Sequence, residues 1–69
     1  MSRLKLLGQN IKKFREAKGY KQIDLAVTLD FSEEYICRIE RGQKYLSLRK
    51  LFQLADILNV KISDLMDFN

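Results

Sequence analysis

Apolar residues recur every three or four positions near the start of the chain. The stripe consists of Leu4, Leu7, Ile11 and Phe14. An α-helix turns once in about 3.6 residues, so this spacing puts all of them on one face and predicts an amphipathic helix over residues 4–18. Gly19 follows directly, and a glycine at this position can adopt the left-handed conformation that closes a helix.

Two shorter segments follow with the same periodicity. The first, residues 22–29, has room for two turns and carries Leu25, Ala26 and Leu29 at helical spacing. Ser32 can then accept a hydrogen bond from the free amides of a new helix, which predicts an N-cap there. That helix, residues 33–41, has its apolar side at Ile36 and Ile39. Gly42 is the expected closing residue.

The last part of the chain contains the most regular stripe. Ser47 is expected to cap a fourth helix, residues 48–58, that forms the main wall of the core. Its stripe is Leu48, Leu51, Phe52, Ala55 and Leu58. Asn59 can close this helix, and Ser63 is expected to begin a last short helix over residues 63–68. Sustained period-two alternation is missing, so the sequence predicts an all-α fold of five helices.

Length and composition narrow the class of protein. The chain has 69 residues, which predicts a single compact domain over residues 1–69 and leaves little room for a deep catalytic pocket. One cysteine, Cys37, and no histidine exclude an internal disulfide and a zinc site, so neither metal nor cofactor is expected. No apolar stretch approaches the ~20 residues that span a bilayer. We therefore expect a cytoplasmic protein that is not an enzyme.

Charge is distributed in blocks along the chain. Residues 1–21 carry seven basic residues and one acidic residue, whereas residues 22–37 carry four acidic residues and no basic one. Residues 38–50 are basic again, with five basic residues and one acidic residue. Basic clusters of this kind favour a polyanion such as nucleic acid. A solvated surface of mixed charge explains the same pattern equally well.

Two short helices joined by a tight turn have the geometry of a helix-turn-helix, in which the second helix enters the major groove of DNA. The residues themselves resemble the phage-repressor-like, Cro/repressor (XRE) type of helix-turn-helix domain, a compact lambda-repressor-like fold. The motifs that carry the resemblance are Gly19-Tyr20-Lys21-Gln22, Asp24-Leu25-Ala26 and Arg38-Ile39-Glu40-Arg41-Gly42. Tyr35-Ile36 and Ser47 give a weaker similarity to the controller proteins of restriction-modification systems.

The resemblance implies which side chains contact base edges. The family's base-contacting positions fall on Glu33, Glu34, Cys37 and Arg38. Arg38 can donate two hydrogen bonds to guanine, and a carboxylate can accept one from cytosine, so a half-site containing G·C is expected. The two glutamates depart from the family pattern. They can contact bases, or they can only stabilise the helix through the positive end of its dipole.

The resemblance also implies contacts beside the bases. The expected flank and sugar-phosphate contacts are Lys12, Lys21, Gln22, Tyr35, Arg41, Lys44 and Tyr45. Arg15 and Glu40 match a structural ion pair that links the first helix to the third. The flank and sugar-phosphate contacts orient a protein on DNA without selecting its sequence.

Two functions from different classes remain open on the sequence. The first is a homodimeric transcription regulator that binds double-stranded DNA at a pseudo-palindromic operator, with half-sites ~34–36 Å apart, and that acts by occupying a promoter or contacting RNA polymerase. The second is a protein-interaction module, such as an antitoxin-like partner. The apolar residues at the chain end, Leu65, Met66 and Phe68, either complete the core or form a dimer interface.

Overall fold

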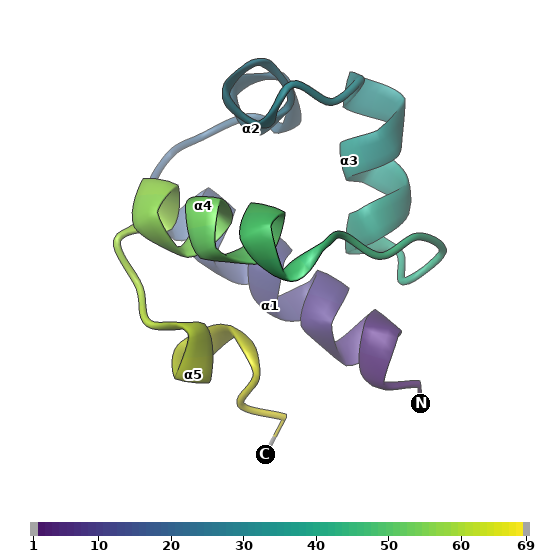
Figure 1. Ribbon diagram of the computed structural model, residues 1–69, viewed down its shortest axis with the longest axis vertical. Helices are drawn as coiled ribbons and strands as arrows, with labels where there is room; N and C mark the ends of the chain where they lie inside the picture. The colour runs from purple at the N-terminus through teal and green to yellow at the C-terminus, as the bar shows by residue number, and fades with distance from the viewer. Residues whose placement is uncertain (1, 69) are drawn as a thin grey trace.

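The computed structural model describes residues 2–68, so Met1 and Asn69 of the expected domain lie outside the described residues. It contains five helices, and no strand occurs among residues 2–68. The helices are α1 (Arg3–Ala17), α2 (Gln22–Leu29), α3 (Glu33–Glu40), α4 (Leu48–Leu58) and α5 (Ile62–Leu65) (Figure 1). The expected all-α fold of five helices is therefore confirmed.

Local capping explains where most of these helices begin and end. Ser32 Oγ accepts a hydrogen bond from the Tyr35 backbone N–H at 3.0 Å, and Ser47 does the same for the N–H of Lys50 at 3.2 Å. At the other ends, Gly19 and Gly42 adopt left-handed φ angles of 77° and 76°. Asn59 closes α4 with a φ of 54°. The predicted caps at Ser32, Ser47 and these closing residues are confirmed.

The last helix differs from its predicted range. It begins at Ile62 and ends at Leu65, whereas residues 63–68 were expected. The Asp64 carboxylate accepts a hydrogen bond from the Lys61 backbone N–H at 2.9 Å, which starts the helix one residue earlier than expected. Asp24 makes the equivalent bond to the N–H of Lys21 at 2.7 Å at the start of α2.

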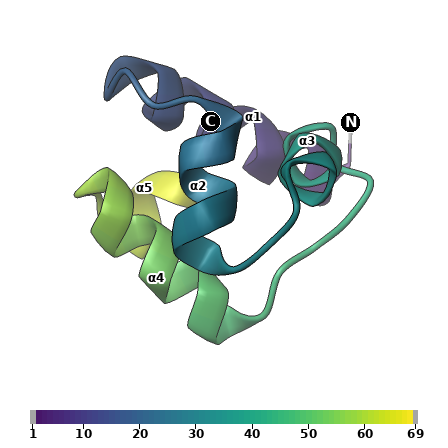
Figure 2. The same ribbon diagram turned by 90° about the horizontal axis from the view of Figure 1, so that it is seen from above.

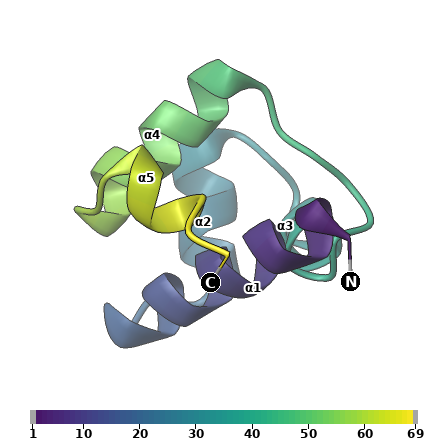
Figure 3. The same cartoon turned by 90° about the horizontal axis from the view of Figure 1, so that it is seen from below.

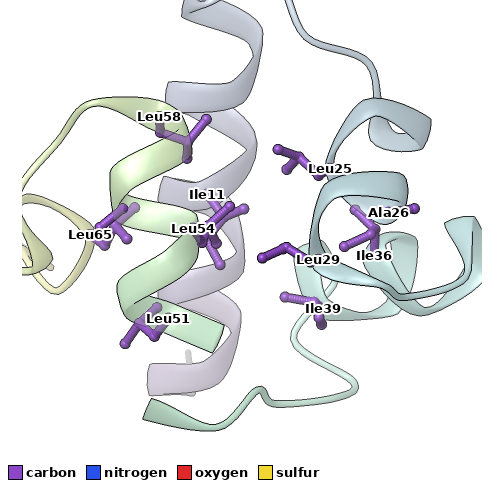
Figure 4. Packing of buried hydrophobic residues seen from close by; sticks show 11 residues of the cluster. Ile11, Leu25, Ala26, Leu29, Ile36, Ile39, Leu51, Leu54, Leu58 and Leu65 are labelled. Carbon is purple, nitrogen blue, oxygen red and sulfur yellow. The ribbon is translucent and has the colours of Figure 1, made fainter. Parts of the chain in front are cut away.

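The core lies among the helices, and in Figure 4 the leucines of α4 lie across from the buried residues of α2 and α3, with α1 behind α4. Its members are Ile11, Leu25, Ala26, Leu29, Ile36, Ile39, Leu51, Leu54, Ala55, Leu58 and Leu65. The stripe expected on α4 was partly wrong, because Leu48 is 64% exposed and Phe52 is 53% exposed. Leu54 is buried in their place. Leucines are so frequent on this helix that two overlapping stripes share the same spacing, and only the neighbouring helices select one of them.

Helix α1 and helix α3 cross at very short distance. Gly8 is buried at the crossing, and a Cβ atom added there would overlap the carbonyl oxygens of Ile39 and Glu40. Helix α3 thus lies directly on the backbone of α1, at one edge of the molecule, and α5 lies at the opposite edge (Figures 2 and 3). Leu4, expected in the α1 stripe, is 38% exposed, since the buried part of the stripe is centred on Ile11.

Candidate functional site

Helices α2 and α3 are joined by a turn of three residues, Asp30 to Ser32. Asp30 adopts a left-handed φ of 59°, which ends α2 and redirects the chain, and the Phe31 backbone N–H donates to the carbonyl of Ala26 at 2.8 Å. Ser32 then caps α3. The two helices pack against each other as a helix-turn-helix unit, with α3 at the edge of the molecule (Figure 1).

Helix α3 has a buried face and an exposed face. Ile36 and Ile39 point into the core, and Glu40 is buried beside them. The exposed face carries the predicted base-contacting residues, with Glu33, Glu34 and Arg38 exposed and Cys37 half-buried. All four therefore share the side of α3 that is turned away from the core.

A buried ion pair anchors the inner end of α3. Arg15 Nε donates to Glu40 Oε2 at 2.7 Å, and Arg15 Nη2 donates to Glu40 Oε1 at 3.1 Å. Gln22 Nε2 donates to the same Oε1 at 3.0 Å. The carboxylate of one α3 residue thus connects α1, the start of α2 and α3, so the structure brings together the residues expected as a structural pair and the glutamine expected to contact phosphate.

The hydrogen bond to Glu40 favours the charged form of Arg15. The hydrogen bond with Glu40 raises the pKa of Arg15 above its usual value, outweighing the opposing effect of burial. Arg15 Nη1 also donates to the carbonyl of Tyr20 at 2.8 Å, which fixes the loop that leads into α2. Every buried polar side-chain atom of residues 2–68 has a hydrogen-bond partner. The network of Arg15, Gln22 and Glu40 therefore leaves no buried polar side-chain atom without a hydrogen bond.

A second ion pair lies on the exposed face of α3. Arg38 Nη2 donates to Glu34 Oε1 at 2.7 Å, and Arg38 Nε donates to the same oxygen at 3.2 Å. The two residues are four positions apart, so they meet on one face of the helix. We expected both residues here as separate base contacts, and the pairing was not predicted. The spacing of four is the sequence signal that reveals it.

The loop after α3 is fastened to the helix by an aromatic residue. Tyr35 Oη donates to the carbonyl of Tyr45 at 2.6 Å, and the Tyr35 ring lies against Phe31 with ring centroids 4.7 Å apart. A surface depression of about 300 Å³ opens beside this contact. Its lining residues are Ser32, Glu34, Tyr35, Arg38 and Lys44. Four of the predicted DNA-contacting residues, Glu34, Tyr35, Arg38 and Lys44, therefore border one hollow.

Lys50 supports the turn between α2 and α3, a role that the sequence did not predict. Its Nζ donates to the carbonyl of Leu29 at the end of α2, and it lies 5.2 Å from the centroid of the Phe31 ring. A cation at the C-terminal end of a helix is favourable because of the helix dipole. Lys50 is on α4, 21 residues from Leu29, so no local spacing signals this contact.

The remaining predicted contacts to the DNA backbone are exposed side chains in three different parts of the chain. Lys12 lies on α1, Lys21 precedes α2 and Arg41 follows α3. Lys21 is the N-cap residue of α2 but makes no side-chain capping bond. Its side chain is exposed at the start of the helix-turn-helix unit.

The C-terminal segment is held to the body of the protein. Asn10 Nδ2 donates to the carbonyl oxygens of Leu65 and Asp67, both at 2.8 Å. Leu65 is 0% exposed and belongs to the core, which is the first of the two alternatives expected for it. Met66 is exposed and Phe68 is half-buried. Of the three residues, Met66 offers the largest accessible surface to a partner.

Residues 2–68 contain neither a metal-binding cluster nor a membrane-spanning helix. No group of three His, Cys, Asp or Glu residues there lies close enough to hold a metal ion. No helix in the same range combines the length and the hydropathy needed to cross a membrane.

Residues 11–65 match the family described as Helix-turn-helix (HTH_3), which covers most of the chain. The protein belongs to this family, the XRE type of helix-turn-helix domain found in transcription regulators. Its relatives include the control protein C.BamHI of Bacillus amyloliquefaciens, which is 36% identical over 64 residues, an alignment that covers 91% of this chain and 79% of that protein.

Solved structures agree with this assignment. The restriction-modification controller protein C.AhdI from Aeromonas hydrophila superposes with a TM-score of 0.81 at 34% identity, covering 90% of this chain and 94% of that chain. SinR, a master regulator for biofilm formation, was solved in complex with DNA and superposes with a TM-score of 0.79 at 32% identity, covering 88% of this chain and 98% of that chain. The repressor-like fold and the similarity to controller proteins are confirmed.

Proposed function

We propose that this protein is a sequence-specific transcription regulator that binds double-stranded DNA with α3 in the major groove. One observation carries the proposal: the exposed face of α3 presents Arg38 and two carboxylates at the edge of the molecule, while Glu40 anchors its inner end to α1 and α2. A groove-inserted helix must be held rigidly for its side chains to meet base edges. Membership of the helix-turn-helix family and similarity to the DNA-bound SinR support the same conclusion.

The exposed groups divide by the chemistry that each can supply. Arg38 donates to guanine O6 and N7, and a carboxylate of Glu33 or Glu34 accepts from cytosine N4. Cys37 is half-buried between them and adds a small contact surface. The side chains that contact sugar and phosphate are Lys12, Lys21, Gln22, Tyr35, Arg41, Lys44 and Tyr45. They orient the protein, since phosphate contacts carry no sequence information of their own.

A homodimer is the assembly that this mode of binding favours. One helix makes few base contacts, and joining two half-sites raises the effective concentration of the second contact. Exposed apolar side chains outside α3 are available for such an interface. Leu48 and Phe52 are four residues apart on α4, and Met66 follows α5. The operator would be pseudo-palindromic, and regulation would follow from occupying a promoter or from contact with RNA polymerase.

Selection of bound duplexes from a random pool tests this function. The purified protein is mixed with the pool at near-physiological salt, and the bound fraction is sequenced. We expect a two-fold symmetric motif with half-sites about 34–36 Å apart. The variant Arg38→Ala should lose the preference for one base pair in each half-site and should retain the spacing.

One result of this selection would contradict sequence-specific DNA binding. If no motif is enriched and weak binding disappears steeply with added salt, the affinity comes only from phosphates. The protein-interaction module would then replace the DNA-binding regulator as the better account. In that case capture of a protein partner should depend on the exposed apolar residues of α4 and not on Arg38.

A further inference from the structure

We propose that Glu34 is a positioning residue that sets the base specificity of Arg38, an inference that rests on the DNA binding through α3 proposed above. The ion pair between them joins two of the exposed residues that face the groove. Both Arg38 Nε and Arg38 Nη2 donate to one oxygen, Oε1 of Glu34, at 3.2 Å and 2.7 Å. One edge of the guanidinium is therefore held by the helix's own carboxylate before any DNA is bound.

The hydrogen bonds leave the rest of the guanidinium free. Arginine has five N–H donors in a planar fork, of which Glu34 takes one on Nε and one on Nη2. The remaining donors lie on Nη1 and on the outer side of Nη2, and these two nitrogens form the edge that can face guanine O6 and N7 together. Glu34 thus fixes the plane of the guanidinium while its outer edge stays available to a guanine.

The same pairing weakens binding to the wrong DNA. On a sequence without the matching guanine, Arg38 has only phosphates to bind, and the carboxylate competes with them for the guanidinium. Specificity is a difference between affinities, so an intramolecular partner that lowers the non-specific affinity raises the specificity. An exposed pair four residues apart is weak, which limits the effect to about a factor of two to five.

Glu33 supplies a matched control on the neighbouring position. It is also exposed in the first turn of α3 and carries the same charge. Its carboxylate has no hydrogen bond or ion pair within residues 2–68. Replacing either glutamate by glutamine removes one negative charge and the same favourable interaction with the helix dipole. A difference between Glu33→Gln and Glu34→Gln therefore reports on the pairing with Arg38.

The test uses the full chain as wild type, Glu34→Gln, Glu33→Gln, Arg38→Ala and the double variant Glu34→Gln/Arg38→Ala. Each protein is titrated against three duplexes over a range of salt. The first duplex carries the motif selected from the random pool. The second duplex is the same motif with one base pair replaced, namely the base pair for which Arg38→Ala loses its preference. The third is unrelated in sequence. Melting temperatures verify that all variants are folded.

We expect Glu34→Gln to bind the unrelated duplex about two- to fivefold more tightly than wild type, because the neutral amide oxygen of glutamine accepts from Arg38 more weakly than the carboxylate does and leaves Arg38 freer to bind phosphates. The slope of log affinity against log salt on that duplex should steepen by about 0.9, the value for one additional phosphate contact. Discrimination between the first two duplexes should fall at least about twofold. Glu33→Gln should change the affinity for the selected motif only through its own base contact, so it should neither steepen the slope on the unrelated duplex nor reduce the discrimination at the base pair that Arg38 contacts. Glu34→Gln should have no effect on the slope or the discrimination in the Arg38→Ala background.

Several results would overturn the inference. Equal changes in Glu33→Gln and Glu34→Gln would show a general charge effect, and an effect of Glu34→Gln that persists without Arg38 would show that the two residues act separately. Arg38→Ala that loses no base preference would also overturn it. These outcomes leave DNA binding intact. If the wild type enriches no motif at all, the proposed function and this inference both fail.

Discussion

Helix α3 carries two arginine–glutamate pairs that share the same chemistry and differ in their surroundings. In the inner pair, Arg15 and Glu40 have side chains that are 9% and 3% exposed, and in the outer pair those of Arg38 and Glu34 are 47% and 73% exposed. The shortest N–O distance is 2.7 Å in both. Distance alone therefore does not distinguish the two pairs. Burial does.

Burial assigns the two pairs to different tasks. A buried charge that loses its partner cannot be solvated, so the inner pair has no alternative arrangement in the folded protein. The outer pair exchanges its partner for water or for another acceptor at little cost. The inner pair consequently holds α3 in position, and the outer pair is free to rearrange when a ligand approaches.

The largest expected effect is on the inner pair. Replacing Glu40 by Ala leaves the Arg15 guanidinium buried without its carboxylate and also removes the acceptor of Gln22. We expect the free energy of unfolding to fall by about 3–5 kcal/mol. Urea unfolding followed by circular dichroism measures it, and Glu33→Ala is the control on the same helix, with a loss of about 0.5 kcal/mol or less. Equal losses in the two variants would remove the distinction between buried and exposed carboxylates.

The stability that the inner pair contributes should also have a characteristic dependence on pH. The hydrogen bond with Glu40 raises the pKa of Arg15 in the folded protein. A raised pKa contributes stability that is fully present below the pKa of the unfolded chain and is lost only as the pH rises through the folded value. Arginine titrates far above neutrality, so the difference in unfolding free energy between wild type and Glu40→Ala should not shrink from neutral to mildly alkaline pH. Unfolding curves at both pH values check this.

The next largest effect concerns the backbone contact beneath the inner pair. Gly8→Ala introduces a Cβ that overlaps the carbonyl of Glu40, so α1 and α3 must separate. Overpacking of this kind costs about 1–3 kcal/mol, which exceeds the roughly 1 kcal/mol that alanine contributes to helix stability. The exposed neighbour Gln9→Ala is the control in the same turn of α1. An unchanged unfolding midpoint for Gly8→Ala would mean that the crossing is looser than the structure shows.

The fold was predictable because its signals are local. Ser32, Gly42 and Asn59 mark helix ends through chemistry that each residue carries itself, and those ends are confirmed. The register of α4 was not predictable, since Leu48 and Leu54 fit equally periodic stripes and only packing against other helices decides between them. Contacts such as the bond from Lys50 to α2 join residues distant in sequence, so no spacing signals them.

The sequence predicted which residues lie on the exposed face of α3, but it did not predict how they interact with one another. Family resemblance supplied the residues of the exposed face of α3, but it treated Glu34 and Arg38 as independent contacts. The structure joins them. For Leu65 the sequence could not decide between two roles. An apolar residue near a chain end fits a core and an interface equally well until its burial is known.

Arg38→Ala should separate binding from stability. Its side chain is exposed and its partner Glu34 is solvated, so the free energy of unfolding should change by about 0.5 kcal/mol or less. Affinity for the selected operator should fall by roughly 5- to 150-fold for each half-site, which corresponds to about 1–3 kcal/mol for a lost pair of base contacts. Fluorescence anisotropy with labelled duplex measures the affinity. A large loss of stability would place Arg38 in the scaffold together with Arg15.

The smallest effect is the coupling energy of the outer pair itself. A double-mutant cycle with Glu34→Ala and Arg38→Ala, followed by urea unfolding, should give about 0.3–0.5 kcal/mol at low salt and less at high salt, because exposed charges are screened. The equivalent cycle on Arg15 and Glu40 should give a coupling several times larger that changes little with salt, since solvent ions do not reach the buried pair. An outer coupling as large and as salt-insensitive as the inner one would mean that the exposed pair is as fixed as the buried one, so burial would not separate a structural pair from one that rearranges when a ligand approaches.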